Sequence, residues 1–148
     1  MIFFYFLARL WVGGIFAFAG FSKLIEPVEN FRAALVQYAI FPYSWTLPLA
    51  AVVPWFELAF GLFLILGYAP RFSAWALATL ALSFLIMLGL SYLKIGHLPT
   101  DCGCFGGSGL KLSGRELLML DFLNFFLAMR LFFVKSHFLS LDAWLHRK

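Results

Sequence analysis

Long apolar segments alternate with short polar stretches along the chain. Four of these segments are each about twenty residues long, which is the length an α-helix needs to cross a hydrocarbon core of about 30 Å. They cover residues 2–24, 46–68, 73–93 and 116–134. The third contains no charged residue, whereas the first contains two, the second one and the fourth three. This pattern predicts four membrane-spanning helices.

A shorter apolar pattern lies between the first two segments, in residues 27–41. Phe31, Ala34, Leu35 and Tyr38 recur there at the spacing of one helical face, and polar side chains lie off that face. Pro residues bracket the segment. We expect a short amphipathic helix that lies at the membrane surface. An irregular loop is the alternative interpretation.

The other two connections differ in length and composition. Residues 67–71 form a tight turn, whereas residues 94–114 form a longer, glycine-rich connection that holds both cysteines. Ser113 and Glu116 match the capping box that opens a helix, so the fourth helix is expected to begin just after Ser113. The pattern predicts an all-α fold: one integral membrane domain over residues 1–148, built as a four-helix up-and-down bundle with an interfacial helix after the first span.

The composition supports a membrane protein. The 148 residues are 64% hydrophobic and 12% charged, whereas a soluble domain is about 45–50% apolar and about 25% charged. The net charge of +4 does not indicate nucleic-acid binding, because the basic residues are scattered at the ends of apolar segments. A secreted disulfide scaffold, a disordered tail and a conventional cytosolic enzyme are excluded as well. No basic region precedes the first apolar segment, which we interpret as an uncleaved span.

Small residues line one side of the first span. Gly13 and Ala17 form a small-xxx-small pair, and Gly20 continues the same side. In lipid, helices associate closely where small residues let their backbones approach. We therefore expect close helix packing along this side of the first span.

The two cysteines, Cys102 and Cys104, are separated only by Gly103. Residues two apart have the Cα spacing that a disulfide needs, and glycine relaxes the backbone of the small ring. Such a bridge adds almost nothing to stability, but a strained disulfide is readily exchanged. Asp101 precedes the pair; its negative charge opposes formation of a thiolate, or its carboxylate accepts a proton. We interpret the pair as redox-active; a metal site that adds His97, or two inert thiols in a glycine turn, are the alternatives.

Ionisable side chains also occur within the predicted spans, where their cost marks them as functional candidates. Arg9 and Glu57 lie in the first and second spans, and Asp121 and Asn124 lie in the fourth. An Arg9–Glu57 pair would fix helix packing; alternatively, Glu57 handles protons for a redox cofactor. Asp121 and Asn124 can polarise a quinone carbonyl or bind a neighbouring helix. These four are the candidate cofactor-binding residues, with a quinone as the candidate cofactor.

Several motifs resemble those of known membrane proteins. The opening of the chain resembles the DoxX-like proteins at Arg9, Gly13, Phe16-x-x-Ala19-Gly20-x-x-Lys23-Leu24 and Pro27. The pattern Pro54-x-x-Glu57-x-x-x-Gly61 continues that resemblance. Asp101-Cys-Gly-Cys-Phe-Gly106 is similar to the cysteine motif of the MauE branch, the methylamine-utilisation protein family. The resemblance covers nearly the whole chain, and the cysteine motif is its most specific part.

The resemblance implies a four-helix protein of the bacterial inner membrane. In MauE such a protein is linked to disulfide formation during maturation of methylamine dehydrogenase, with a thioredoxin-like partner, and DoxX relatives are tied to quinone-linked sulfur oxidation. It implies that Cys102 and Cys104 are the redox pair and places Arg9, Lys23 and Glu57 at family positions. Better understood membrane thiol oxidases have a Cys-x-x-Cys and a second pair, so exchange by this single pair would be direct.

The leading hypothesis is a membrane thiol–disulfide oxidoreductase, with Cys102 and Cys104 exchanging with a thioredoxin-fold protein or an envelope client. The basic residues divide almost equally between the two sides of the bundle and so do not orient it. A working disulfide belongs in an oxidising compartment, which puts the cysteine connection outside the cytoplasm and both termini within. The alternatives are a non-catalytic subunit that docks or stabilises a partner complex, and a small-molecule carrier that uses Glu57 and Arg9.

Overall fold

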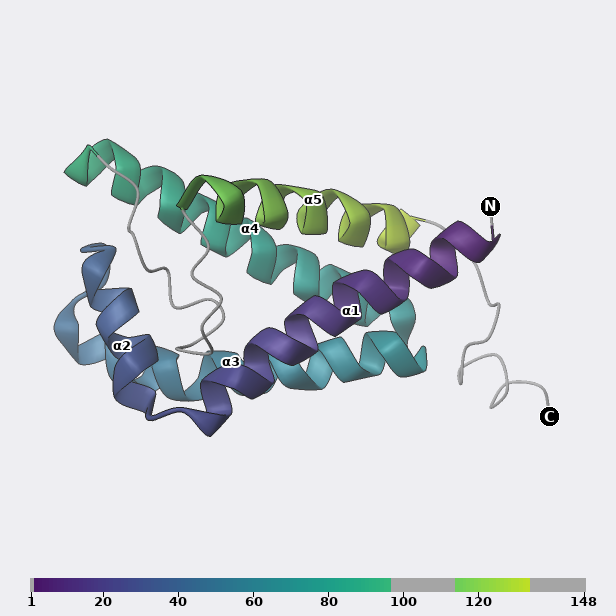
Figure 1. The fold of residues 1–148 in the computed structure, drawn as a ribbon, viewed down its shortest axis with the longest axis horizontal. Coiled ribbons are helices and arrows are strands. Elements are labelled where there is room, and N and C mark those ends of the chain that lie inside the picture. Colours follow the sequence, from purple (N-terminus) through teal and green to yellow (C-terminus); the bar gives the residue numbers. More distant parts are fainter. Residues whose placement is uncertain (1, 97–113, 134–148) are drawn as a thin grey trace.

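The computed structural model describes residues 2–96 and 114–133, which fold into five α-helices (Figure 1). The helices are α1 (Ile2–Ile25), α2 (Val28–Gln37), α3 (Tyr43–Leu66), α4 (Pro70–Ile95) and α5 (Gly114–Phe133). The four long helices alternate in direction: α1 and α4 run towards the end that carries α2, and α3 and α5 run back (Figure 1). The described part of the chain is therefore all-α, as the sequence predicts.

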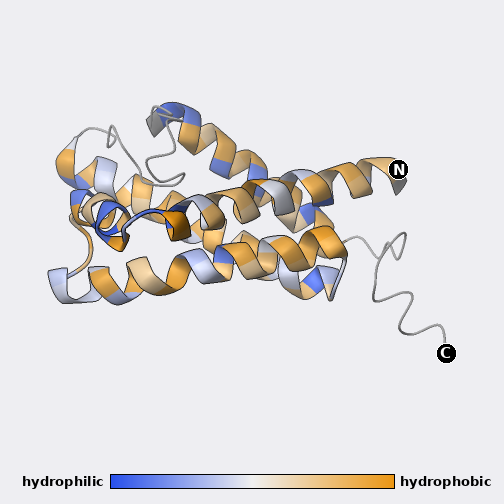
Figure 2. Cartoon of the chain, turned by 60° about the horizontal axis from the view of Figure 1, so that its bottom comes forward, coloured by the Kyte–Doolittle hydropathy of each residue, from blue (hydrophilic) through white to orange (hydrophobic). Residues whose placement is uncertain are grey.

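Three helices of the described part are long and apolar enough to cross a membrane: Phe3–Ile25, Tyr43–Leu66 and Pro70–Ile95. Helix α5 has 20 residues but also carries charged side chains near both ends and at its centre. The fourth predicted span is thus present as a helix, and its crossing of the membrane stays a prediction. Apolar residues dominate the long helices, with polar residues gathered mainly towards their ends (Figure 2).

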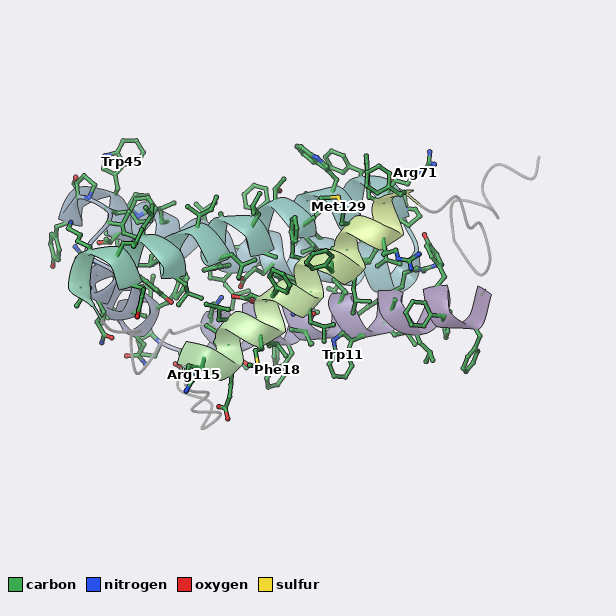
Figure 3. All side chains as sticks on the ribbon, turned by 90° about the horizontal axis from the view of Figure 1, so that it is seen from above. Trp11, Phe18, Trp45, Arg71, Arg115 and Met129 are labelled. Atoms are coloured by element: carbon green, nitrogen blue, oxygen red, sulfur yellow. The ribbon has the colours of Figure 1, made fainter. Side chains whose placement is uncertain are left out.

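The outer surface of the helices is rich in large apolar side chains. Trp45 and Trp55 are each 63% exposed. Trp11 and Phe18 are also exposed and point away from the neighbouring helices (Figure 3). Such an apolar surface is typical of helices that face lipid, because its exposure to water would be energetically unfavourable.

The turn between α3 and α4 is as tight as predicted. Gly67 has a φ of 71°, the left-handed conformation that favours glycine at a helix end. The amides of Gly67 and Tyr68 donate to the carbonyls of Leu64 and Phe63, at 3.2 and 2.9 Å, and so close the end of α3. Pro70 then occupies the first turn of α4, where its missing N–H costs nothing.

Small residues bring α1 and α3 into backbone contact. A Cβ placed on Gly20 would lie 2.6 Å from backbone atoms of Pro54 and Leu58, and one on Gly61 would lie 2.6 Å from the amide nitrogen of Ala17. No side chain fits at these distances. The expected close packing along this side of the first span is confirmed, with Gly61 of α3 as the facing residue.

Helix α2 buries its apolar face against the other helices. Phe31, Ala34, Leu35 and Tyr38 are all buried, as their helical spacing predicts. Phe31, Leu35 and Tyr38 belong to one hydrophobic cluster with Ala50 of α3, Phe84, Met87 and Leu88 of α4, and Leu117 of α5. An interfacial helix would insert this face into lipid, whereas here protein covers it. The amphipathic helix is therefore present, and its position at a membrane surface stays a prediction.

Candidate functional site

The predicted redox residues lie outside the described part of the structure. Cys102, Cys104 and Asp101 belong to the connection between α4 and α5. The structure describes the two ends of this connection, at Gly96 and Gly114. Both ends lie in the half of the molecule that also contains α2 (Figure 1).

A buried ion pair joins α1 to α3. The ammonium of Lys23 donates to both carboxylate oxygens of Glu57, at 2.8 and 2.7 Å, and the two side chains are only 1% and 2% exposed. The same ammonium lies 4.6 Å from the ring centre of Phe31 and 5.3 Å from that of Phe84. Lys23 therefore links α1 with α2, α3 and α4. The two hydrogen bonds and the aromatic faces offset the cost of removing both charges from water.

Arg9 is buried elsewhere along α1. Its Nε and Nη2 donate to the backbone carbonyls of Leu64 and Ile65, at 3.1 and 3.0 Å. These carbonyls belong to the last turn of α3, where main-chain acceptors have no partner within the helix and a cation is favoured. The interpretation of an Arg9–Glu57 pair is therefore wrong, because Arg9 donates to carbonyls at the end of α3 and Glu57 forms its ion pair with Lys23.

Beside the ion pair, α5 contributes two buried polar side chains. Asn124 is 0% exposed and Asp121 is 8% exposed. Within residues 2–96 and 114–133, the Oδ2 atom of Asp121 and both the Oδ1 and Nδ2 atoms of Asn124 have no hydrogen-bond partner. Together with Glu57 they line a cavity of about 20 Å³. A cavity of that size holds about one water molecule.

A larger groove opens between α4 and α5. Its volume is about 640 Å³, and its lining consists of Leu88, Gly89 and Tyr92 of α4 with Arg115, Leu118 and Met119 of α5. The walls are mainly apolar, and Tyr92 and Arg115 supply a hydroxyl and a guanidinium. Tyr92 lies four residues before Gly96, and Arg115 directly follows Gly114. The polar part of the groove therefore borders both ends of the cysteine connection.

A family model described as methylamine utilisation protein MauE matches residues 1–135. The chain belongs to the MauE family. The match covers all five described helices and both cysteines, so the resemblance seen in the cysteine motif is confirmed. No curated protein and no solved structure matches the chain. Family membership and the three long apolar helices together describe a multi-pass membrane protein, consistent with a role in methylamine utilisation.

The structure separates the four candidate cofactor residues of this MauE-family protein. Glu57, Asp121 and Asn124 line one cavity, whereas Arg9 lies against the end of α3. The cavity is too small for a quinone ring, which is several times larger than a water molecule. No local pattern assigns Lys23 a partner, but its position inside the helix Ile2–Ile25, together with Glu57 in the second span, is a signal for a buried pair.

No group of three His, Cys, Asp or Glu side chains within residues 2–96 and 114–133 of this MauE-family protein is placed to hold a metal ion. The alternative metal site is made of His97 and the two cysteines. All three of those residues lie outside the described ranges. The redox and the metal interpretations of the cysteine pair therefore both rest on the sequence.

Proposed function

We propose that this MauE-family protein is a membrane thiol–disulfide oxidoreductase of the bacterial envelope. The observation that carries the proposal is the Cys102-Gly103-Cys104 sequence, between α4 and α5, in a chain that matches the family model over residues 1–135. Two cysteines at this spacing form a small strained ring, and strained disulfides are the labile ones. Asp101 stands next to the pair as a proton acceptor for the reacting thiol.

The exchange transfers two electrons and two protons. A thiolate of the reduced partner attacks the Cys102–Cys104 disulfide and forms a mixed disulfide, releasing one cysteine as a thiolate. The second thiol of the partner then attacks the mixed disulfide, so that the partner leaves oxidised and the pair is left as two thiols. A thioredoxin-fold protein or an envelope client supplies the thiols. A quinone, which takes up two electrons and two protons to become a quinol, is the proposed acceptor that restores the disulfide.

The ends of the connection limit where this chemistry takes place. Cys102 is the sixth residue after Gly96, and an extended chain of six residues spans at most about 20 Å. Helix α4 has 26 residues, which makes it about 39 Å long. The pair therefore cannot reach the far end of α4. This supports exchange at one face of the membrane, on the α2 side of the molecule.

We place α1, α3, α4 and α5 across the bacterial inner membrane as an up-and-down bundle, with α2 at the surface. Helix α5 has 20 residues, or about 30 Å, which matches the hydrocarbon core. Its charged side chains lie near its ends or, for Asp121, in the buried polar cluster. An exchanging disulfide requires an oxidising compartment, so the cysteine connection is extracytoplasmic and both termini are cytoplasmic.

Replacing the cysteines is expected to abolish exchange. In membranes supplied with the oxidised partner, the remaining cysteine of one of the single variants Cys102→Ala and Cys104→Ala should attack the disulfide of a thioredoxin-fold protein or client and hold it as a mixed disulfide. The second cysteine that would complete the exchange is missing. The double variant should capture nothing and should lose client oxidation. Non-reducing electrophoresis with mass spectrometry measures the capture, and a membrane-impermeant alkylating reagent reports the redox state and the side of the pair. Full client oxidation by the double variant would instead support a non-catalytic docking subunit.

We assign the quinone to the groove between α4 and α5. Its volume of about 640 Å³ falls within the range of small-molecule sites, about 300–1,000 Å³. Arg115 and Tyr92 can each donate a hydrogen bond to a quinone carbonyl. Both residues border the cysteine connection, which keeps the acceptor close to the thiols.

Filling the groove is expected to slow reoxidation of the cysteine pair. A Cβ at Gly89 meets no atom within 4 Å, so Gly89→Leu occupies the groove without disturbing the helix packing. We expect quinone-dependent reoxidation to slow about tenfold, which corresponds to about 1.4 kcal/mol in the barrier. The matched control is Gly14→Leu on α1, where a Cβ also meets nothing within 4 Å. Equal reoxidation rates in the two variants would contradict the assignment of the quinone to this groove. The proposed thiol exchange with the partner would still stand.

A further inference from the structure

We propose that the cavity beside the Lys23–Glu57 pair binds one water molecule and one proton, held by Asp121 and Asn124. Thiol exchange does not require this site, so the inference stands apart from the proposed function. It rests on the unpartnered polar atoms that line the cavity and on the number of charges around it.

The water is inferred from atoms that otherwise have no partner. Asp121 Oδ2 and Asn124 Oδ1 and Nδ2 are buried without a hydrogen bond to any described residue, and both residues line a cavity of about 20 Å³. Buried polar groups are nearly always satisfied, and a site of this size with several polar partners is one that water occupies. The amide of Asn124 can donate to the water, and the carboxyl oxygens of Asp121 and Glu57 can accept from it.

The proton is inferred from the balance of charge. Among the described residues, Lys23 on α1 and Glu57 on α3 are the charged groups that act on Asp121, and the described residues of α4 and α5 that line the cavity with it add no further charge. Both oxygens of Glu57 already accept from the Lys23 ammonium. If both carboxyls were ionised, Asp121 would be a buried anion without a counter-charge, which is strongly unfavourable. A proton on Asp121 removes that charge and supplies an O–H donor to the water or to Asn124 Oδ1.

The position of the site suggests where this proton exchanges. Asp121 lies seven residues into α5 from Gly114, or about 10 Å along the helix. Lys23 lies two residues before the end of α1. The site is therefore a short distance inside the end of the helices from which the cysteine connection leaves, so that end is the nearer source of a proton.

Infrared spectroscopy of the full-length protein in lipid vesicles at neutral pH tests whether Asp121 is protonated. The wild type should show the C=O stretch of a protonated carboxylic acid, shifted in D₂O, and Asp121→Asn should lack it. The matched control Glu29→Gln removes an exposed carboxyl of α2 and should retain the band. If the wild type lacks the band, or if the band persists in Asp121→Asn, then Asp121 is not protonated and the proposal is overturned.

Two further measurements keep the proposal testable if Asp121→Asn does not assemble. Asn124→Ser leaves the carboxyl of Asp121 in place but changes its surroundings, so the carboxylic acid band should shift. An unshifted band would overturn the assignment of the band to Asp121. The water should appear as an O–H stretch that shifts on exchange into ¹⁸O-labelled water and disappears in Asn124→Leu. If the wild type has no such band, or if Asn124→Leu retains it, the cavity does not hold the water.

Discussion

Glu57→Gln is expected to lower the free energy of unfolding by about 3–5 kcal/mol. The substitution keeps the shape of the side chain but leaves the Lys23 ammonium buried without a counter-charge, and breaking one half of a buried ion pair carries a cost of this size. The rings of Phe31 and Phe84 cannot replace a full negative charge. Titration of the protein from lipid–detergent micelles into a denaturing detergent, followed by circular dichroism, measures the change.

The double variant Lys23→Met with Glu57→Leu separates the cost of an unpaired charge from the value of the pair. Replacing both partners with apolar residues of similar size is often neutral or stabilising, so this variant should recover most of the stability lost by Glu57→Gln. Glu29→Gln, on the exposed face of α2, serves as the control and should change stability by less than about 0.5 kcal/mol. A double variant as unstable as Glu57→Gln would show that the pair stabilises through something other than charge neutralisation. A stable double variant that still oxidises its client would give the pair a purely structural role.

Gly20→Ala is expected to lower the free energy of unfolding by about 3 kcal/mol, at the upper end of the usual cost of overpacking. The added methyl would lie 2.6 Å from the carbonyl oxygen of Pro54 and from the amide nitrogen of Leu58. Because these are backbone atoms of a neighbouring helix, α1 and α3 must move apart to admit the methyl. The Lys23–Glu57 pair joins the same two helices and would be strained by that movement. Detergent-induced unfolding measures the loss.

The matched control is Gly14→Ala on the same helix. A Cβ at Gly14 meets no atom within 4 Å, and alanine is a better helix former than glycine by about 1 kcal/mol. The control should therefore be neutral or slightly stabilising. Equal losses at Gly14 and Gly20 would mean that the cost arises from the helix itself and not from its contact with α3.

The helices were predictable because their signals are local, and their boundaries were predictable to within a few residues. The observed helix α3 begins at Tyr43, three residues before the predicted span, because the residues that follow Pro42 form its first turn ahead of the apolar run. Helix α2 ends at Gln37, short of the predicted residue 41, where Ala39 has a positive φ of 52°. The turn at Gly67 was predictable from its residue types alone.

The partner of Glu57 was not predictable in the same way. Position along a span indicates depth in the membrane, and by depth Arg9 and Glu57 lie close enough to suggest a pair. The register between α1 and α3 depends instead on the contacts of Gly20 with Pro54 and of Gly61 with Ala17. That register places Arg9 level with the last residues of α3. Glu57 is left facing the second half of α1, where Lys23 reaches it.

The sequence by itself determined the membrane class, the helices, the close-packing side of α1 and the MauE cysteine motif. These features are read from local hydrophobicity, helical period and residue type, which do not require knowledge of any neighbour. Only the tertiary structure decided that Lys23 binds Glu57 and that Asp121 and Asn124 share a cavity with that pair. Those contacts join residues of α1, α3 and α5 that are far apart along the chain. Helix register and rotation, which no local pattern records, bring them together.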